Sequence, residues 1–105
     1  MNEDRAYISR LVDIYGKALS ERQRDVVDLY YNEDLSLAEI SEHCGITRQG
    51  VRDAIRHGVE TLNSLESALG FYKKSEKIAL LVSDIQNCDD IERAKSIADS
   101  IIGEL

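Results

Sequence analysis

Three arginines recur at four-residue intervals, Arg48, Arg52 and Arg56, and this spacing places them on one face of a helix. Thr47 and Gln49 stand beside them at the start of the same predicted helix. A guanidinium donates two parallel hydrogen bonds to guanine, and a Gln amide pairs with adenine in the same two-point manner. These residue types predict a surface that contacts base edges or phosphates.

Other interpretations of this arginine face remain open. Asp53 lies on or near the same face, where its carboxylate would repel phosphate, and Asp53 and Glu60 are possible local ion-pair partners that would leave the face merely solvated. An acidic protein surface is an alternative ligand. Gly50 costs about 1 kcal/mol relative to Ala in a helix. Its lack of a side chain in the exposed first turn would permit a close approach to the backbone.

A second basic cluster follows Gly70 and consists of Lys73, Lys74 and Lys77. As a continuation of the arginine face it would follow an RNA or DNA backbone. The alternative is an ordinary solvated helix face.

Nothing in the chain indicates catalysis. His43 and His57 have no cysteine or carboxylate partners at metal-ligand spacing, and Cys44 and Cys88 lack the spacing of a zinc or redox motif. There is no phosphate-binding loop and no nucleophile motif. We therefore expect a protein that is not an enzyme and has no cofactor and no metal site.

The elements around the arginine face predict a helix-turn-helix over residues 36–56. Ser36 and Glu39 form a capping box before a helix at 37–44, Gly45 supplies a left-handed turn, and Thr47 caps the next helix. Small Ser41 would let the two helix axes approach. The apolar and small residues expected to face the angle between the helices are Ile40, Cys44, Ile46, Val51 and Ala54.

The rest of the chain reads as helix without strands, which predicts an all-α fold. Hydrophobic periodicity predicts helices at 3–18, from the Ser20 cap to 31, from 48 to about 68, from 71 or 73 to 86, and from an Asp89 or Asp90 cap to about 102. Gly70 is the expected break. We expect a helix-turn-helix domain at 1–70 and a C-terminal helical hairpin at 71–105.

Charge is unevenly distributed along the 105 residues, whose net charge is −7. Residues 1–46 carry 10 acidic and 5 basic side chains, residues 47–77 carry 4 and 6, and residues 78–105 carry 6 and 2. DNA-binding modules usually have a basic footprint, so the overall acidity argues against simple DNA binding. The absence of a signal-peptide core and of a membrane-length apolar run predicts a cytoplasmic protein without membrane insertion.

The C-terminal helices have apolar stripes that must be covered. In the last helix, Ile91, Ala94, Ala98, Ile101 and Leu105 repeat at intervals of three and four residues. About 35 residues make a thin core by themselves. The hairpin is therefore expected to pack on its own chain, to form a homodimer, or both.

The segment from Leu19 to Ile55, LSERQRDVVDLYYNEDLSLAEISEHCGITRQGVRDAI, resembles the fourth conserved region of bacterial sigma factors, which reads the −35 promoter element. The whole chain is similar to the YlxM family, and the segments that carry this similarity are LYYNEDLSLAEISE and GITRQGVRDAI. The resemblance implies a sigma-like helical bundle, and nucleic acid facing Thr47, Arg48, Gln49, Arg52 and Arg56. It also implies a link to the signal recognition particle. Gly50 departs from the longer polar side chain typical of sigma factors. The chain has no polymerase-binding region.

Three functional hypotheses follow. The resemblance favours a non-enzymatic accessory protein of the signal recognition particle that contacts its RNA, its GTPase or both. The motif alone favours a dimeric transcriptional regulator that binds DNA through residues 47–56. The third is a protein-binding adaptor whose arginine face no longer binds nucleic acid.

Overall fold

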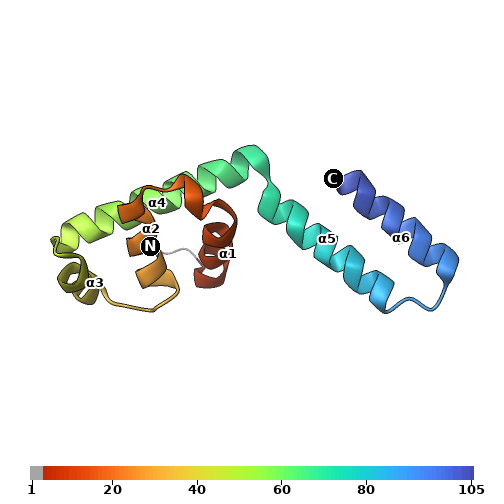
Figure 1. Ribbon diagram of the computed structural model, residues 1–105, viewed down its shortest axis with the longest axis horizontal. Coiled ribbons are helices and arrows are strands. Elements are labelled where there is room, and N and C mark those ends of the chain that lie inside the picture. Colours follow the sequence, from red (N-terminus) through yellow and green to blue (C-terminus); the bar gives the residue numbers. More distant parts are fainter. Residues whose placement is uncertain (1–3) are drawn as a thin grey trace. The chain divides into compact units, whose positions relative to one another are not determined.

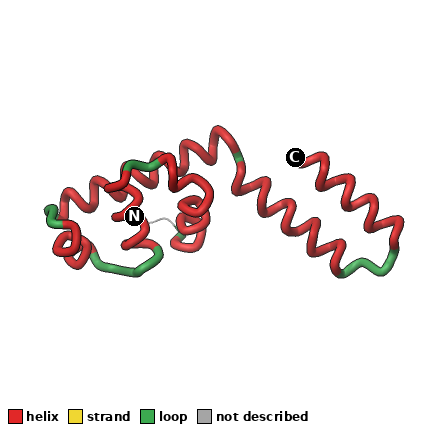
Figure 2. The backbone as a smooth tube through the Cα atoms, viewed as in Figure 1, coloured by secondary structure: helices red, strands yellow, loops and turns green. Residues whose placement is uncertain are grey.

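The computed structural model of the protein describes residues 4–105 and contains helices joined by short connections (Figure 1). The α-helices are α1 (Arg5–Tyr15), α2 (Glu21–Tyr31), α3 (Leu37–Cys44), α4 (Arg48–Leu69), α5 (Phe71–Gln86) and α6 (Ile91–Glu104), and a short 3-10 helix, η1 (Gly16–Ala18), follows α1. Figure 2 shows no strand in this part of the chain, so the all-α prediction is confirmed.

The expected caps determine where the helices begin. Ser20 and Gln23 form a complete capping box at the start of α2, and Ser36 and Glu39 form another at α3. At α1 the cap is Asp4, whose carboxylate accepts from the backbone N–H groups of Ala6 and Tyr7. Each cap satisfies N–H groups that the helix itself leaves unpaired, which fixes the first turn.

Two glycines end helices in the left-handed conformation. Gly45 has φ +67° after α3, and Gly70 has φ +65° between α4 and α5. A residue with a Cβ adopts this conformation only at a cost, because the Cβ approaches its own carbonyl. The predicted turn and the predicted break are therefore both present.

The chain divides into two compact units, the first ending at Leu69 and the second beginning at Gly70. In the first unit, α1, α2 and α3 all pack against α4 (Figure 1). Within residues 4–69, the buried hydrophobic side chains come from these helices and the α1–α2 connection: Ile8, Leu11, Tyr15, Leu19, Val26, Val27, Tyr31, Ile40, Val51, Ile55, Val59 and Leu62. This core holds the amino-terminal part of α4 in place.

The second unit is a hairpin of α5 and α6 connected by residues 87–90. None of its residues is buried, although both helices are amphipathic. Ile78, Leu81 and Ile85 of α5 are half-buried, as are Ile97 and Ile101 of α6. The hairpin therefore has helix-to-helix contacts but no enclosed core.

Several sequence-based boundaries need correction. The first helix was expected to continue to Ala18, but it ends at Tyr15 and the chain tightens into η1 at Gly16, where glycine weakens the helix. Its expected start, Glu3, lies outside the described residues. Helix α6 continues two residues beyond the expected end, to Glu104. No helix in residues 4–105 combines the length and hydropathy that spanning a membrane requires.

Candidate nucleic-acid interface

The helix-turn-helix is built by α3, the turn at Gly45 and Ile46, and the first turns of α4. Ile40 and Val51 are fully buried between these helices, whereas Cys44, Ile46 and Ala54 are only half-buried. The hydroxyl of Ser41 donates to the backbone carbonyl of Ile46. Ser41 therefore holds the turn directly, in addition to the small size noted in the sequence.

The predicted arginine face lies on the exposed side of α4. Thr47, Gln49 and all three arginines are exposed, while Val51 and Ile55 on the same helix are buried. Neither Arg48 nor Arg52 has an ion-pair partner among the described residues. The structure thus places these five predicted site residues together at the start of one helix, with two guanidinium groups available to a ligand.

Asp53 is the centre of a small network within this face. Its Oδ1 accepts a hydrogen bond from Gln49 Nε2 at 3.0 Å and lies 3.3 Å from Arg56 Nη2. Both partners of the ion pair remain accessible, with 55% of the Arg56 side chain and 41% of the Asp53 side chain exposed. Asp53 therefore pairs locally with Arg56, as one sequence-based interpretation expected, but no such pair with Glu60 appears in the described part of the chain.

Thr47 serves the fold as well as the surface. Its Oγ1 accepts from the backbone N–H of Gly50 at 3.0 Å and so caps α4. A Cβ at residue 50 would lie 3.2 Å from that same oxygen. The small size of Gly50 thus accommodates the cap, a local reason for glycine beside the proposed approach of a ligand.

The three lysines of the second basic cluster belong to the second unit, on α5. All are exposed, but Lys77 Nζ lies 2.7 Å from Glu104 Oε1 of α6, so this ion pair ties the hairpin together. Lys74 lines a hollow of about 380 Å³ with Phe71, Ser75, Ile78 and Leu105. Lys73 is also exposed.

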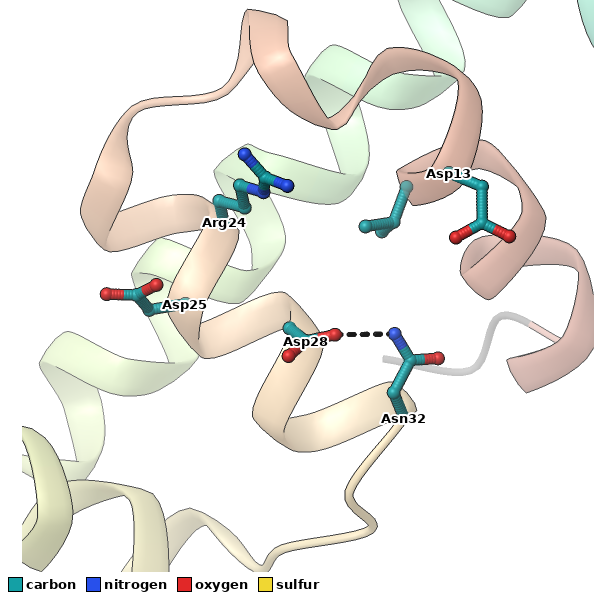
Figure 3. Close-up of a pocket in the computed structure, with 6 residues that line it drawn as sticks. Asp13, Arg24, Asp25, Asp28 and Asn32 are labelled. Carbon is teal, nitrogen blue, oxygen red and sulfur yellow. Dashed lines mark hydrogen bonds between the residues drawn. The ribbon is translucent and has the colours of Figure 1, made fainter.

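An acidic hollow between α1 and α2 was not identified from the sequence. It has a volume of about 300 Å³ and is lined by Val12, Asp13, Arg24, Asp25, Asp28 and Asn32 (Figure 3). Asn32 Nδ2 donates to Asp28 Oδ1 at 2.6 Å. Asp25 and Asp28 also line a neighbouring hollow of about 230 Å³ beside His43 and Cys44. Helical spacing of Asp25 and Asp28 was the available signal, but their juxtaposition with α1 and α3 depends on the tertiary fold.

These acidic and histidine-bearing regions do not form a metal site of recognisable composition. Within residues 4–105, no group of three or more His, Cys, Asp or Glu side chains is arranged to hold a metal ion. Cys44 and Cys88 are free thiols, both half-buried.

The capped α3, the left-handed turn and the exposed start of α4 define a helix-turn-helix protein. The model of a family described as "Putative helix-turn-helix protein, YlxM / p13 like", UPF0122, matches residues 2–101. The chain belongs to this family, so its resemblance to the YlxM family is confirmed.

Named relatives have the same family designation. A UPF0122 protein of Caldanaerobacter subterraneus subsp. tengcongensis is 38% identical over 88 residues, covering 84% of this chain and 75% of the relative. One of Clostridium kluyveri is 47% identical over 76 residues, 72% of this chain and 68% of its own. One of Desulforamulus reducens is 41% identical over 90 residues, 85% and 77% of the two chains.

Proposed function

We propose that this protein is a non-enzymatic accessory protein of the signal recognition particle pathway, acting in the cytoplasm. Its arginine face would bind the particle RNA, with Thr47, Arg48, Gln49, Arg52 and Arg56 as the contact residues. The observation that carries this proposal is the pair of exposed guanidinium groups at Arg48 and Arg52, at the start of a helix fixed by a buried core. A helix start also favours anions, because its backbone N–H groups are unpaired.

The acidic hollow supports a second contact, to a basic protein component such as the particle GTPase. Asp13, Asp25 and Asp28 line this hollow together with one basic side chain, Arg24. Oppositely charged surfaces on one small unit would orient it between an RNA and a basic protein, because complementary potentials guide encounter more than they add affinity. Lys73, Lys74 and Lys77 are proposed as a secondary contact with the RNA backbone.

We also propose that the protein acts as a homodimer. The support for this proposal is the hairpin, which has six large exposed hydrophobic side chains: Phe71, Leu80, Val82, Ile91, Ile102 and Leu105. A unit of this size without a buried residue gains little from the hydrophobic effect until another surface covers it.

The second candidate is a regulator that binds DNA through the same face. The observation that favours it is that Gln49 and Arg52 are side chains suited to adenine and guanine edges. Direct contacts to bases predict selection of one sequence from random duplexes. Contacts to the RNA backbone predict binding to structured RNA and no selected duplex.

A titration of labelled particle RNA and of random duplex DNA with the full chain, at several salt concentrations, distinguishes these candidates. We expect RNA binding that weakens steeply with salt, by a slope of about −0.7 to −0.9 per phosphate neutralised. Replacing Arg52 with Ala should weaken binding by roughly fivefold to a hundredfold. Arg22→Ala on α2 is the matched control, since it removes the same charge from another exposed site.

Retention of the particle GTPase and RNA in a pull-down at moderate salt tests the assignment to the pathway. Retention of neither component would contradict it. If Arg48→Ala and Arg56→Ala leave binding to a protein partner unchanged and no nucleic acid binds, the protein is an adaptor instead.

A further inference from the structure

The apolar residues of the hairpin are not scattered around its two helices. Phe71 and Val82 are separated by eleven residues on α5, and Ile91 and Ile102 are separated by eleven on α6. Eleven residues make three turns plus about 20°, so each pair lies on one line along its helix. All four side chains are exposed, from 41% for Val82 to 72% for Ile91.

These two lines lie on the same side of the hairpin. On α5, the half-buried Ile78 and Leu81 face α6, and the line of Phe71 and Val82 is rotated away from them in the direction in which successive residues advance around the helix. On α6, the line of Ile91 and Ile102 is rotated in the same sense from the half-buried Ile97 and Ile101. Because the helices are antiparallel, rotations in the same sense bring both lines to one face. The hollow that Phe71 and Leu105 share is consistent with this geometry.

The other side of the hairpin differs. Leu80 is half a turn away from Phe71 and Val82 on α5, and it is flanked by polar positions at Lys73, Lys77 and Asp84. We therefore define the apolar face of the hairpin as Phe71, Val82, Ile91, Ile102 and Leu105.

Two charged residues at the edge of this face are arranged symmetrically. Lys95 and Asp99 lie between the two isoleucines on the same side of α6, and the midpoint of Lys95 and Asp99 is Ile97. The midpoint of Ile91 and Ile102 falls between Ser96 and Ile97. A two-fold axis at this level would place Ile91 of one copy near Ile102 of a second copy. It would also place Lys95 of each copy near Asp99 of the other.

From this juxtaposition, we propose that the apolar face binds the same face of a second copy of this chain, with the two α6 helices antiparallel about an axis near Ile97. The result is a four-helix arrangement with an isologous interface. A parallel pairing is disfavoured because it would bring Lys95 next to Lys95 and Asp99 next to Asp99. Among the described residues, Lys95 pairs with Glu92, whose Oε1 lies 4.0 Å from Lys95 Nζ; both side chains are exposed, so the ammonium remains accessible.

This inference rests on the homodimer in the proposed function and specifies its surface. Its test measures the mass of the full chain without nucleic acid, by sedimentation equilibrium over a range of concentrations. Failure of RNA binding and failure of dimerisation are therefore separate results. We expect a dimer that dissociates only at low micromolar concentration or below, roughly the range of a modest interface.

Ile102→Gln should raise the dissociation constant of the dimer by roughly tenfold or more, since two isoleucines leave the interface. Leu80→Gln is the matched control, because Ile102 and Leu80 are both 68% exposed and lie on opposite sides of the hairpin. Circular dichroism checks that both variants keep their helices. Equal weakening by both variants, or a single-chain mass for the unmodified protein at about 100 µM, would overturn the proposal.

A charge exchange tests the antiparallel arrangement. Lys95→Glu and Asp99→Lys should each raise the dissociation constant by roughly threefold to tenfold, because each variant brings like charges together twice per dimer. The double variant Lys95→Glu, Asp99→Lys should restore the original value. Persistent weakening in the double variant would refute the axis near Ile97.

Discussion

Asp53 determines how much of the arginine face a ligand meets in the free protein. One carboxylate oxygen engages both Gln49 and Arg56. Nucleic acid must compete for these two side chains, while Arg48 and Arg52 are accessible without rearrangement. At the scale of single residues, Arg48 and Arg52 are therefore accessible to a ligand, whereas Gln49 and Arg56 are engaged by the Asp53 carboxylate.

Replacing Asp53 with Asn should strengthen binding to RNA or DNA by about twofold to tenfold, because it removes one repulsive charge and frees Arg56 from an exposed ion pair. Fluorescence anisotropy with a fixed salt concentration measures the change. Glu21→Gln on α2 removes the same charge outside the face and should leave the affinity nearly unchanged. Equal strengthening by both variants would mean that net charge alone is responsible.

Glu39 gives the α3 cap a dependence on pH. The backbone N–H of Ser36 donates to Glu39 Oε1 at 3.0 Å, and this hydrogen bond, followed by that with the Ser36 side chain, lowers the pKa of Glu39 below its ordinary value of 4.5. A carboxyl whose pKa is lowered by folding stabilises the fold above its unfolded pKa. That contribution is lost as the pH falls through the folded pKa.

The α2 capping box is a natural control for this pH dependence. Gln23 occupies the position in α2 that Glu39 occupies in α3; it does not titrate but accepts the equivalent hydrogen bond from the Ser20 backbone N–H. We expect a carbon-13 NMR titration to give Glu39 a pKa below 4.5, and Glu39→Gln to remove part of the loss of stability under acidic conditions. A normal pKa for Glu39 in solution would contradict the closed capping box.

At the scale of elements, the close approach of α2 and α4 depends on Gly58. A Cβ at residue 58 would lie 2.8 Å from Val27 Cγ2, and Val27 is fully buried. Gly58→Ala should therefore destabilise the protein by about 1 to 3 kcal/mol, the usual cost of overpacking. Urea denaturation measures this change.

The matched control is Gly103→Ala, which adds the same methyl group to α6 where nothing lies within 4 Å. It should be neutral or stabilising by up to about 1 kcal/mol through helix propensity. Destabilisation by both substitutions to the same degree would exclude packing against Val27 as the cause.

Local chemistry made the elements largely predictable, whereas their contacts were not. The capping boxes at Ser20 and Ser36 and the left-handed glycines depend on neighbours within a few residues, so the sequence contains their complete explanation. The hydrogen bond from Tyr15 Oη to Glu66, at 2.7 Å, joins residues that are 51 positions apart. Its formation depends on how α1 packs against α4, which periodicity does not specify.

The candidate site shows the same contrast between features that local sequence predicts and contacts that depend on the tertiary fold. The shared face of Arg48, Arg52 and Arg56 follows from helical spacing alone. The pairing of Asp53 with two members of that face required side-chain positions, and the acidic hollow required α1, α2 and α3 to be placed together. A sequence pattern thus identifies a face on one helix more readily than a surface shared by several.

At the scale of the whole molecule, burial is concentrated in one unit. Every fully buried hydrophobic side chain among the described residues lies before Gly70, and none lies in α5 or α6. Hydrophobic burial is the main stabilising contribution to folding, so the two units should differ sharply in their intrinsic stability.

A fragment of residues 1–69 should therefore unfold cooperatively, with a free energy of unfolding within about 1 to 2 kcal/mol of the same unit in the full chain. A peptide of residues 70–105 should be largely unfolded at low micromolar concentration and gain helix as its concentration rises, because fewer than about 40 residues rarely fold without association. Circular dichroism over a hundredfold range of concentration measures the helix content of the peptide and of the fragment. The fragment of residues 1–69 is the control, since its signal should not depend on concentration. A peptide that is equally helical at every concentration would show that the two helices are stable without a covering surface, and the exposed isoleucines of α6 would then need another explanation.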